Sequence, residues 1–225
     1  MKPFLEEHGA ATGLLVATLL GGLVAEWAVT AHERIETELG EGARSSSRAR
    51  VAAHALVEVA TTRTRGKAEE DRRTKTILVV GMLAGFLLAV LAARSFPGLT
   101  LPGDGWVWVV LGVALCAAGL ALRVWAVAVL GRFFRRDVVV QEGHVVVEDG
   151  PYQRIRHPAY AGNLLVALGV GIALANWLGI AALVVVSFLG HLPRIRVEEH
   201  ELERQLGEPY RRYEARTARL VPGIW

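Results

Sequence analysis

The residues best suited to chemistry lie in the last third of this 225-residue chain, where a histidine precedes a proline. Proline presets helical φ and disfavours helix in the residue before it, so a helix is predicted to start at Pro158 with His157 as its N-cap. The backbone N–H groups of Ala159 and Tyr160 are then expected to have no acceptor within the helix. Together with the positive end of the helix dipole, they suit a carboxylate or a phosphate.

A second group of charged residues begins at Arg194 and includes Glu198, Glu199, Glu201 and Glu203. Arg194 and Glu198 are four residues apart, so one interpretation is a solvated helix with weak surface pairing. The other is a charged lid that offers carboxylates to a cationic ligand and a guanidinium to an anionic one. Gly207 is predicted to end this helix, and residues 210–219 are predicted to form another, basic and amphipathic helix.

Several common sites are missing from the sequence. It has no phosphate-binding Walker loop, no nucleophile-elbow serine, no zinc-ligand spacing and no Gly-rich turn after a strand, so no metal site is expected. Gly169-Val170-Gly171 lies in an apolar run and is interpreted as a helix-packing notch. Cys116, the single cysteine, is expected to be inert packing, and Arg123 either snorkels to the interface or lines a cavity.

The composition indicates which structural elements position these residues. The chain is 52% hydrophobic and 21% charged, its mean hydropathy is +0.35, and its apolar residues form long blocks. Blocks at 10–31, 76–93 and 106–130 are each long enough to cross a membrane. Few aromatic residues lie among the basic ones, so nucleic acid is excluded as a partner.

The fourth apolar block, residues 158–192, contains no Asp, Glu, Lys or Arg. As one helix it would be about 50 Å long, too long for a single crossing. Asn176-Trp177 is predicted to be a turn between helices at about 159–175 and 178–192. We therefore expect an all-α polytopic membrane protein with five transmembrane helices and a C-terminal helical hairpin.

The basic residues give this topology an orientation. Residues 32–75 contain ten Lys and Arg, residues 131–158 contain five, and residues from Pro193 onward contain seven. Five spans place these three segments on one side, which the positive-inside rule makes cytoplasmic, with the N-terminus outside and the C-terminus inside. Residues 1–75 are expected to hold the first span and a cytoplasmic segment that lies on the inner leaflet or serves substrate entry, and residues 76–225 the core.

The motifs together resemble the isoprenylcysteine carboxyl methyltransferase family, whose wider relatives include phospholipid N-methyltransferases. The resemblance covers about residues 130–225. It rests on Gln141, His144-Val-Val, Gly150-Pro-Tyr152, Arg156-His-Pro-Ala-Tyr160-Ala-Gly162, Arg194 with Glu198-Glu199, and Gly207-Glu-Pro-Tyr210.

The resemblance implies a methyltransferase with a cytosolic pocket for S-adenosylmethionine, which leaves as S-adenosylhomocysteine. It assigns Arg194 to the substrate and makes Arg194 and Glu198 the catalytic pair. The lipid bilayer and a lipophilic or prenylated substrate are the implied partners. The implied cofactor contacts are Gln141, His144, Val145, Val146, Val147, Tyr152, His157, Pro158, Ala159, Tyr160, Glu198 and Glu199.

The methyl acceptor is expected to be an isoprenylcysteine-like carboxylate, which is already ionised at pH 7 and needs no general base. The alternative is a phospholipid or other amine, which would have to lose a proton to His144, His191 or a glutamate of the tail. Two further alternatives are a sterol-type membrane reductase that uses NADPH and a membrane scaffold without catalysis.

Overall fold

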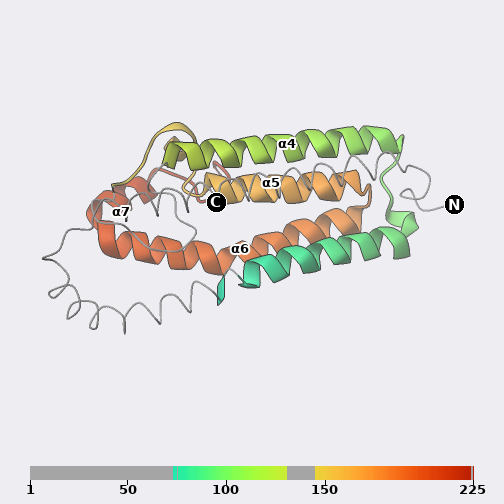
Figure 1. Ribbon diagram of the computed structural model, residues 1–225, viewed down its shortest axis with the longest axis horizontal. Coiled ribbons are helices and arrows are strands. Elements are labelled where there is room, and N and C mark those ends of the chain that lie inside the picture. The colour runs from blue at the N-terminus through green and yellow to red at the C-terminus, as the bar shows by residue number, and fades with distance from the viewer. Residues whose placement is uncertain (1–72, 75, 131–144, 224) are drawn as a thin grey trace, which may run out of the picture.

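The computed structural model describes residues 73–74, 76–130, 145–223 and 225, and the regular secondary structure of these residues is helical apart from two isolated β-bridges. The predicted first span, most of the 1–75 unit, Gln141 and His144 lie outside the described residues. In chain order the elements are the Thr76–Ser95 helix, η1 (Pro97–Leu99), α4 (Gly105–Leu130), η3 (Gly150–Gln153), α5 (Pro158–Ala173), α6 (Trp177–Leu206) and α7 (Glu208–Glu214). Figure 1 shows the four long helices side by side, each antiparallel to the next in sequence.

Three described helices are long and apolar enough to cross a membrane: Thr76–Ser95, α4 and α6. The chain is an integral membrane protein. The α5 helix is apolar but has 16 residues, about 24 Å, so it is shorter than a typical single crossing. The predicted turn is present, since α5 ends at Ala173 and α6 begins at Trp177.

One predicted boundary is wrong. The second arm of the hairpin was expected to end near residue 192, but α6 continues through Pro193 to Leu206 as one helix. Proline removes one hydrogen bond from a helix interior, which packing can offset. The buried residues His191, Arg194 and Ile195 lie on both sides of Pro193 at helical spacing, so they hold this part of α6 against its neighbours. Gly207, with φ 60°, ends the helix as predicted.

Glycines allow α4 and α5 to pack backbone to backbone. A Cβ built on Gly119 would lie 2.6 Å from the carbonyl oxygen of Gly162, and one built on Gly112 would lie 2.5 Å from that of Gly169. The two glycines on each helix are seven residues apart, so the same face meets its partner at two levels. Gly169 thus belongs to a helix-packing notch, as predicted.

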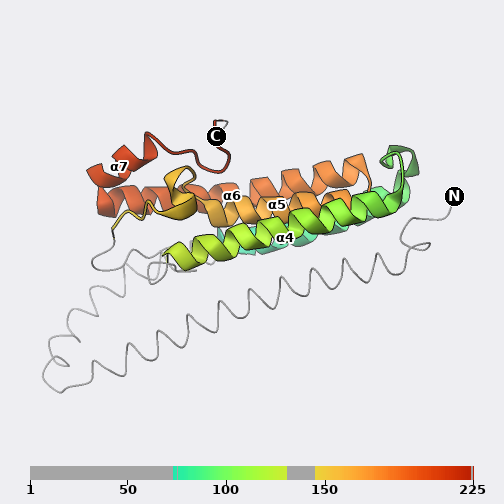
Figure 2. The same cartoon turned by 90° about the horizontal axis from the view of Figure 1, so that it is seen from above.

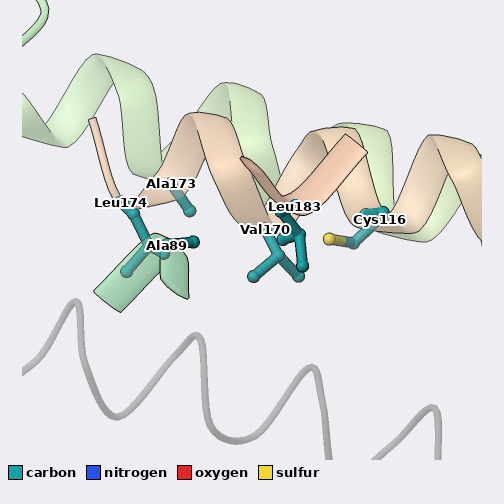
Figure 3. Packing of buried hydrophobic residues seen from close by; sticks show 7 residues of the cluster. Ala89, Cys116, Val170, Ala173, Leu174 and Leu183 are labelled. Carbon is teal, nitrogen blue, oxygen red and sulfur yellow. The ribbon is translucent and has the colours of Figure 1, made fainter. Parts of the chain in front are cut away.

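The Thr76–Ser95 helix packs on α6. A Cβ on Gly179 would lie 3.1 Å from the carbonyl oxygen of Ala89, and one on Gly85 would touch Leu183 at 3.3 Å. Figure 3 shows the apolar cluster that joins the helices, with Cys116 buried as an ordinary packing residue. The cluster consists of Ala89, Cys116, Ala167, Val170, Ala173, Leu174 and Leu183.

Asn176 ties the hairpin turn to the end of the Thr76–Ser95 helix. It is the N-cap of α6, where its Oδ1 accepts the N–H of Gly179 at 3.0 Å. Its Nδ2 donates to the carbonyl oxygen of Phe96 at 3.0 Å, and the N–H of Leu101 donates to Ala175 at 2.8 Å. These bonds fix the end of the bundle opposite Arg194.

The second amphipathic helix is shorter than predicted. We expected it over 210–219, but α7 covers only Glu208–Glu214, and the chain then runs back along the segment before α5. The reason is pairing: the N–H of Arg156 donates to Ala218 at 2.8 Å and the N–H of His157 donates to Arg219 at 3.0 Å. Figure 2 shows this C-terminal segment returning from α7 along α6.

Candidate active site

Tyr160 is the hub of the polar groups between α5 and α6. Its hydroxyl donates to Oε2 of Glu198 at 2.7 Å and accepts the Nε–H of Arg194 at 2.9 Å. Arg194 is only 5% exposed although it follows an apolar stretch of α6. One phenol therefore joins the predicted substrate arginine to the predicted cofactor glutamate.

His157 lies beside this hub at the start of α5. Its ring stacks on the ring of Tyr160 with centroids 5.5 Å apart. Its Nε2 lies 3.3 Å from Oε1 of Glu199, and its Nδ1 lies 3.9 Å from Oε2 of Glu198. Because an ionised carboxylate only accepts hydrogen bonds, this network assigns the proton to Nε2.

The two adjacent glutamates have different surroundings. The Glu199 side chain is 9% exposed and is contacted by Arg156, His157 and Arg219. The Glu198 side chain is 31% exposed, so a ligand can reach it. Sequence reasoning gave both carboxylates to the cofactor, whereas the geometry favours Glu198 as the one that meets a ligand.

Glu199 lies beyond the apolar part of α6, which ends at residue 192. Burial alone would raise the pKa of its carboxyl group. The hydrogen bonds and charges of His157 and Arg156 outweigh that effect and lower the pKa from 4.5 to about 2. Glu199 is therefore an anion at every physiological pH.

A second polar pair lies one helical turn further into the apolar region. His191 is fully buried, and its Nδ1 donates to the carbonyl oxygen of Ser187 at 2.7 Å. That bond leaves Nε2 as the acceptor of the neutral ring, 3.3 Å from Nδ2 of Asn163. The His191 ring also lies 5.3 Å from that of Tyr160. Both ring nitrogens of His191 are thus engaged.

The start of α5 differs in one detail from the prediction. The N–H of Tyr160 was expected to lack an acceptor within the helix, but it donates to the carbonyl oxygen of His157 at 3.1 Å. This hydrogen bond between residues three apart, as in a 3₁₀-helix, tightens the first turn, which is common at helix ends. His157 is the N-cap residue, as predicted, and makes no side-chain capping bond.

The segment before α5 carries the other predicted cofactor residues. Val145 is exposed, and Val146 and Val147 are half-buried in a stretch without regular secondary structure. Tyr152 is buried in η3. Burial first and the charge of Glu198 second raise the pKa of the Tyr152 hydroxyl. A Cβ built on Gly162 would lie 3.1 Å from the Cβ of Arg123, so Arg123 lies at the contact between α4 and α5.

Sequence reasoning missed two arginines that hold the site together. Arg156 belongs to the quoted motif but received no role, and Arg219 was only part of a predicted helix. The Arg156 side chain is 7% exposed and donates to Glu199 and to the carbonyl oxygens of Glu214 and Thr217. No spacing rule links position 219 to position 156, because the pairing depends on how the chain returns after α7.

Comparisons with known proteins show what this chain is similar to. Residues 110–204 match the isoprenylcysteine carboxyl methyltransferase (ICMT) family. Protein-S-isoprenylcysteine O-methyltransferases B and A of Arabidopsis thaliana are 32% and 31% identical to this chain over 148 residues. In both cases the match covers 64% of this chain and 73% of the relative.

A solved structure has a similar fold: the eukaryotic intramembrane Ras methyltransferase ICMT, with a TM-score of 0.54 and 28% identity. The match covers 65% of this chain and 52% of that one, so the chain spans about half the length of the solved protein. The fold and site thus define an integral membrane methyltransferase. The chain belongs to the isoprenylcysteine carboxyl methyltransferase family.

Proposed function

We propose that this protein transfers a methyl group from S-adenosylmethionine to the carboxylate of a lipophilic, isoprenylcysteine-like acceptor. The observation that carries the proposal is the contact of Tyr160 with both Glu198 and Arg194. It places a carboxylate suited to a cation next to a guanidinium suited to an anion, at the end of a membrane-embedded hairpin.

The residues present fit the cofactor. Glu198 is ionisable and partly exposed, so it would attract the positive sulfonium or amino group of S-adenosylmethionine. The first turn of α5, from Pro158 to Tyr160, would hold the carboxylate of the cofactor at the positive end of the helix dipole. Val145–Val147 and Tyr152 would line the remaining side. When bound, the cofactor supplies an electrophilic methyl group.

Arg194 would hold the acceptor. Its buried guanidinium is fixed through Nε by the hydroxyl of Tyr160, so its orientation is set before a substrate arrives. A planar guanidinium suits a carboxylate, and one carboxylate oxygen could be held while the other attacks. Burial of this end of α5 and α6 excludes water, which strengthens the charge interactions.

The hydrogen bonds of His191 favour a carboxylate acceptor over an amine acceptor. An amine would require a base, and two of the proposed bases, His191 and the tail glutamate Glu198, lie near Tyr160 within the described residues. The Nδ1–H of His191 donates to Ser187 and its Nε2 faces the amide of Asn163, so His191 holds no lone pair directed at a substrate. Glu198 accepts the hydroxyl of Tyr160 and is assigned to the cofactor. A carboxylate acceptor needs no such base. Membership of a methyltransferase family likewise favours methyl transfer over a nicotinamide-dependent reduction.

We also propose the orientation of the protein in the membrane. Five spans, with the N-terminus outside, place Arg194 and Glu198 on the cytoplasmic side with the three arginine-rich segments. A prenylated acceptor would then reach the site from the inner leaflet. Residues 32–75 would lie along that leaflet.

Calorimetry on the purified protein in detergent tests the proposal. We expect both S-adenosylmethionine and S-adenosylhomocysteine to bind with one-to-one stoichiometry, and NADPH not to bind. A subsequent assay would offer prenylcysteine analogues and aminophospholipids as acceptors. Binding of NADPH instead of S-adenosylhomocysteine would overturn the methyltransferase assignment.

A further inference from the structure

Four charged side chains form a closed ring beside the candidate site. Arg156 contacts Glu199, with Nε 2.9 Å from Oε1, and Glu214, with Nη2 3.5 Å from Oε1. Arg219 contacts the same two carboxylates, with Nε 2.8 Å from Oε2 of Glu199 and Nη2 4.0 Å from Oε1 of Glu214. Two guanidinium groups thus alternate with two carboxylates. We call these four residues the charge ring.

Each member of the charge ring comes from a different segment. Arg156 precedes α5, Glu199 lies on α6, Glu214 ends α7, and Arg219 lies in the C-terminal segment. Backbone bonds support the same junction, because the N–H of Ala218 donates to the carbonyl oxygen of Arg154 at 3.0 Å. The ring therefore joins residues 217–219 to the strand-like segment that leads into α5.

One member of the ring touches the candidate cofactor site directly. Oε1 of Glu199, which Arg156 contacts, also lies 3.3 Å from Nε2 of His157. The His157 ring stacks on Tyr160, whose hydroxyl contacts Glu198. Loss of one cation from the ring would leave the buried Glu199 carboxylate undercompensated and free His157 to move.

A cation–π contact adds to this junction. The guanidinium of Arg219 lies 5.2 Å from the ring centroid of Trp225, and that ring lies 5.4 Å from Phe188 of α6. The C-terminal segment is thus attached to α6 as well as to the segment before α5. Its position depends on Arg219 at both contacts.

We propose that the charge ring is a positioning device for cofactor binding, and that Arg156, Glu214 and Arg219 are positioning residues. They hold the C-terminal segment against residues 154–157, and through Glu199 they fix His157 at the start of α5. This proposal rests on the proposed function, because it assumes that the His157–Tyr160 turn binds S-adenosylmethionine. Docking of the C-terminal segment and cofactor binding should then each favour the other.

The test compares S-adenosylhomocysteine binding by calorimetry in the full-length protein and in Arg219→Gln and Arg156→Gln. We expect each change to raise the Kd at least about fivefold, and Arg219→Lys, which keeps the charge, to recover part of the loss. Arg211→Gln is the matched control. It removes the exposed Arg211–Glu203 pair, 2.8 Å apart, and should leave the Kd unchanged.

Hydrogen exchange supplies a second readout. In the wild-type protein, saturating S-adenosylhomocysteine should slow exchange of the amides of His157 and Ala218, which pair the two segments. In Arg219→Gln the same saturation should protect Ala218 less. A structural role alone would lower the melting temperature without changing this ligand-induced protection.

The outcomes separate the two proposals. If the wild-type protein binds no S-adenosylhomocysteine, the proposed function fails. If the wild type binds and both Arg219→Gln and Arg219→Lys keep its Kd and its protection at Ala218, the positioning role of the charge ring is overturned. The lysine variant, with its retained charge, covers the case in which Arg156→Gln does not fold.

Discussion

The hydroxyl of Tyr160 lies 2.9 Å from Nε of Arg194, so a phenol on α5 orients a buried arginine on α6. The same hydroxyl donates to Glu198, and it can do both because a phenol is at once a donor and an acceptor. In this arrangement the groups that we propose to bind the acceptor and the cofactor are fixed relative to each other by one atom.

Tyr160→Phe removes that atom while keeping the ring that stacks on His157. We expect S-adenosylhomocysteine binding to weaken about tenfold, or about 1.4 kcal/mol, because Glu198 loses its hydrogen-bond donor. Glu198→Gln should weaken binding by at least as much. Calorimetry provides the measurement, with Glu203→Gln as a control on the same helix. Wild-type affinity in both Tyr160→Phe and Glu198→Gln would remove the pocket assignment.

Arg194→Lys keeps the positive charge but loses the planar donor set. Loss of one charge-assisted hydrogen bond costs roughly 1.5–3 kcal/mol, so kcat/KM for the acceptor should fall about 10- to 150-fold. Affinity for S-adenosylhomocysteine should change little, since that ligand is assigned to Glu198 and the start of α5. Unchanged turnover in this variant would argue against Arg194 as the residue that holds the acceptor.

The glycine contact between α4 and α5 predicts a loss of stability. Gly119→Ala would place a Cβ 2.6 Å from the carbonyl oxygen of Gly162, so the two helices would have to separate. We expect destabilisation of about 1–3 kcal/mol, measured as a lower thermal midpoint in detergent. Gly98→Ala has open space around its Cβ and is the matched control. Equal midpoints for the two variants would contradict the close contact.

Activity should depend little on pH between about 6 and 8. A carboxylate acceptor is fully ionised there. Glu199, whose pKa is lowered to about 2, is ionised as well. Because its folded-state pKa is depressed, its stabilising effect is complete above the ordinary value of 4.5 and is lost only as the pH falls toward 2. A rate that falls steeply from pH 8 to pH 6 would instead indicate an amine acceptor.

The topology predicts which positions a membrane-impermeant thiol reagent can reach. A cysteine at Ser46 should be labelled only from the cytoplasmic face, and one at Gly98 only from the opposite face. Cys116 is buried and should not react in either case. Labelling of both introduced cysteines from one side would mean that a span has been miscounted.

Much of the fold could be predicted from the sequence because membrane helices have strong local signals. The charge-free run over 158–192 and the polar Asn176 within it predicted a hairpin, and Pro158 predicted where its first helix begins. The continuation of α6 past Pro193 could not be predicted from local rules, because it depends on the burial of Arg194 and Glu199 against α5 and the C-terminal segment.

The residues of the candidate site also divide into those that the sequence could predict and those that it could not. The motif residues Arg194 and Glu198 both contact the hydroxyl of Tyr160, and the assignment of these three residues to the cofactor and the acceptor stays a prediction. Asn163 had a signal that we did not use, since a polar residue inside a membrane helix often has a function. Arg219 had none, because its partner Glu199 lies 20 residues earlier in the chain, on α6, and only the return of the C-terminal segment brings Arg219 to the carboxylate that Arg156 also contacts.

The central claim is carboxyl methylation, and the chemical stability of the product tests it most directly. The purified protein in lipid vesicles would receive S-adenosylmethionine labelled in its methyl group and a farnesylcysteine analogue with a free carboxylate. We predict transfer of the label into the lipid fraction and its complete release as methanol after mild alkali, because a methyl ester hydrolyses and an N-methyl group does not. Label that resists alkali, or transfer to aminophospholipids but not to the farnesylcysteine analogue, would contradict the account.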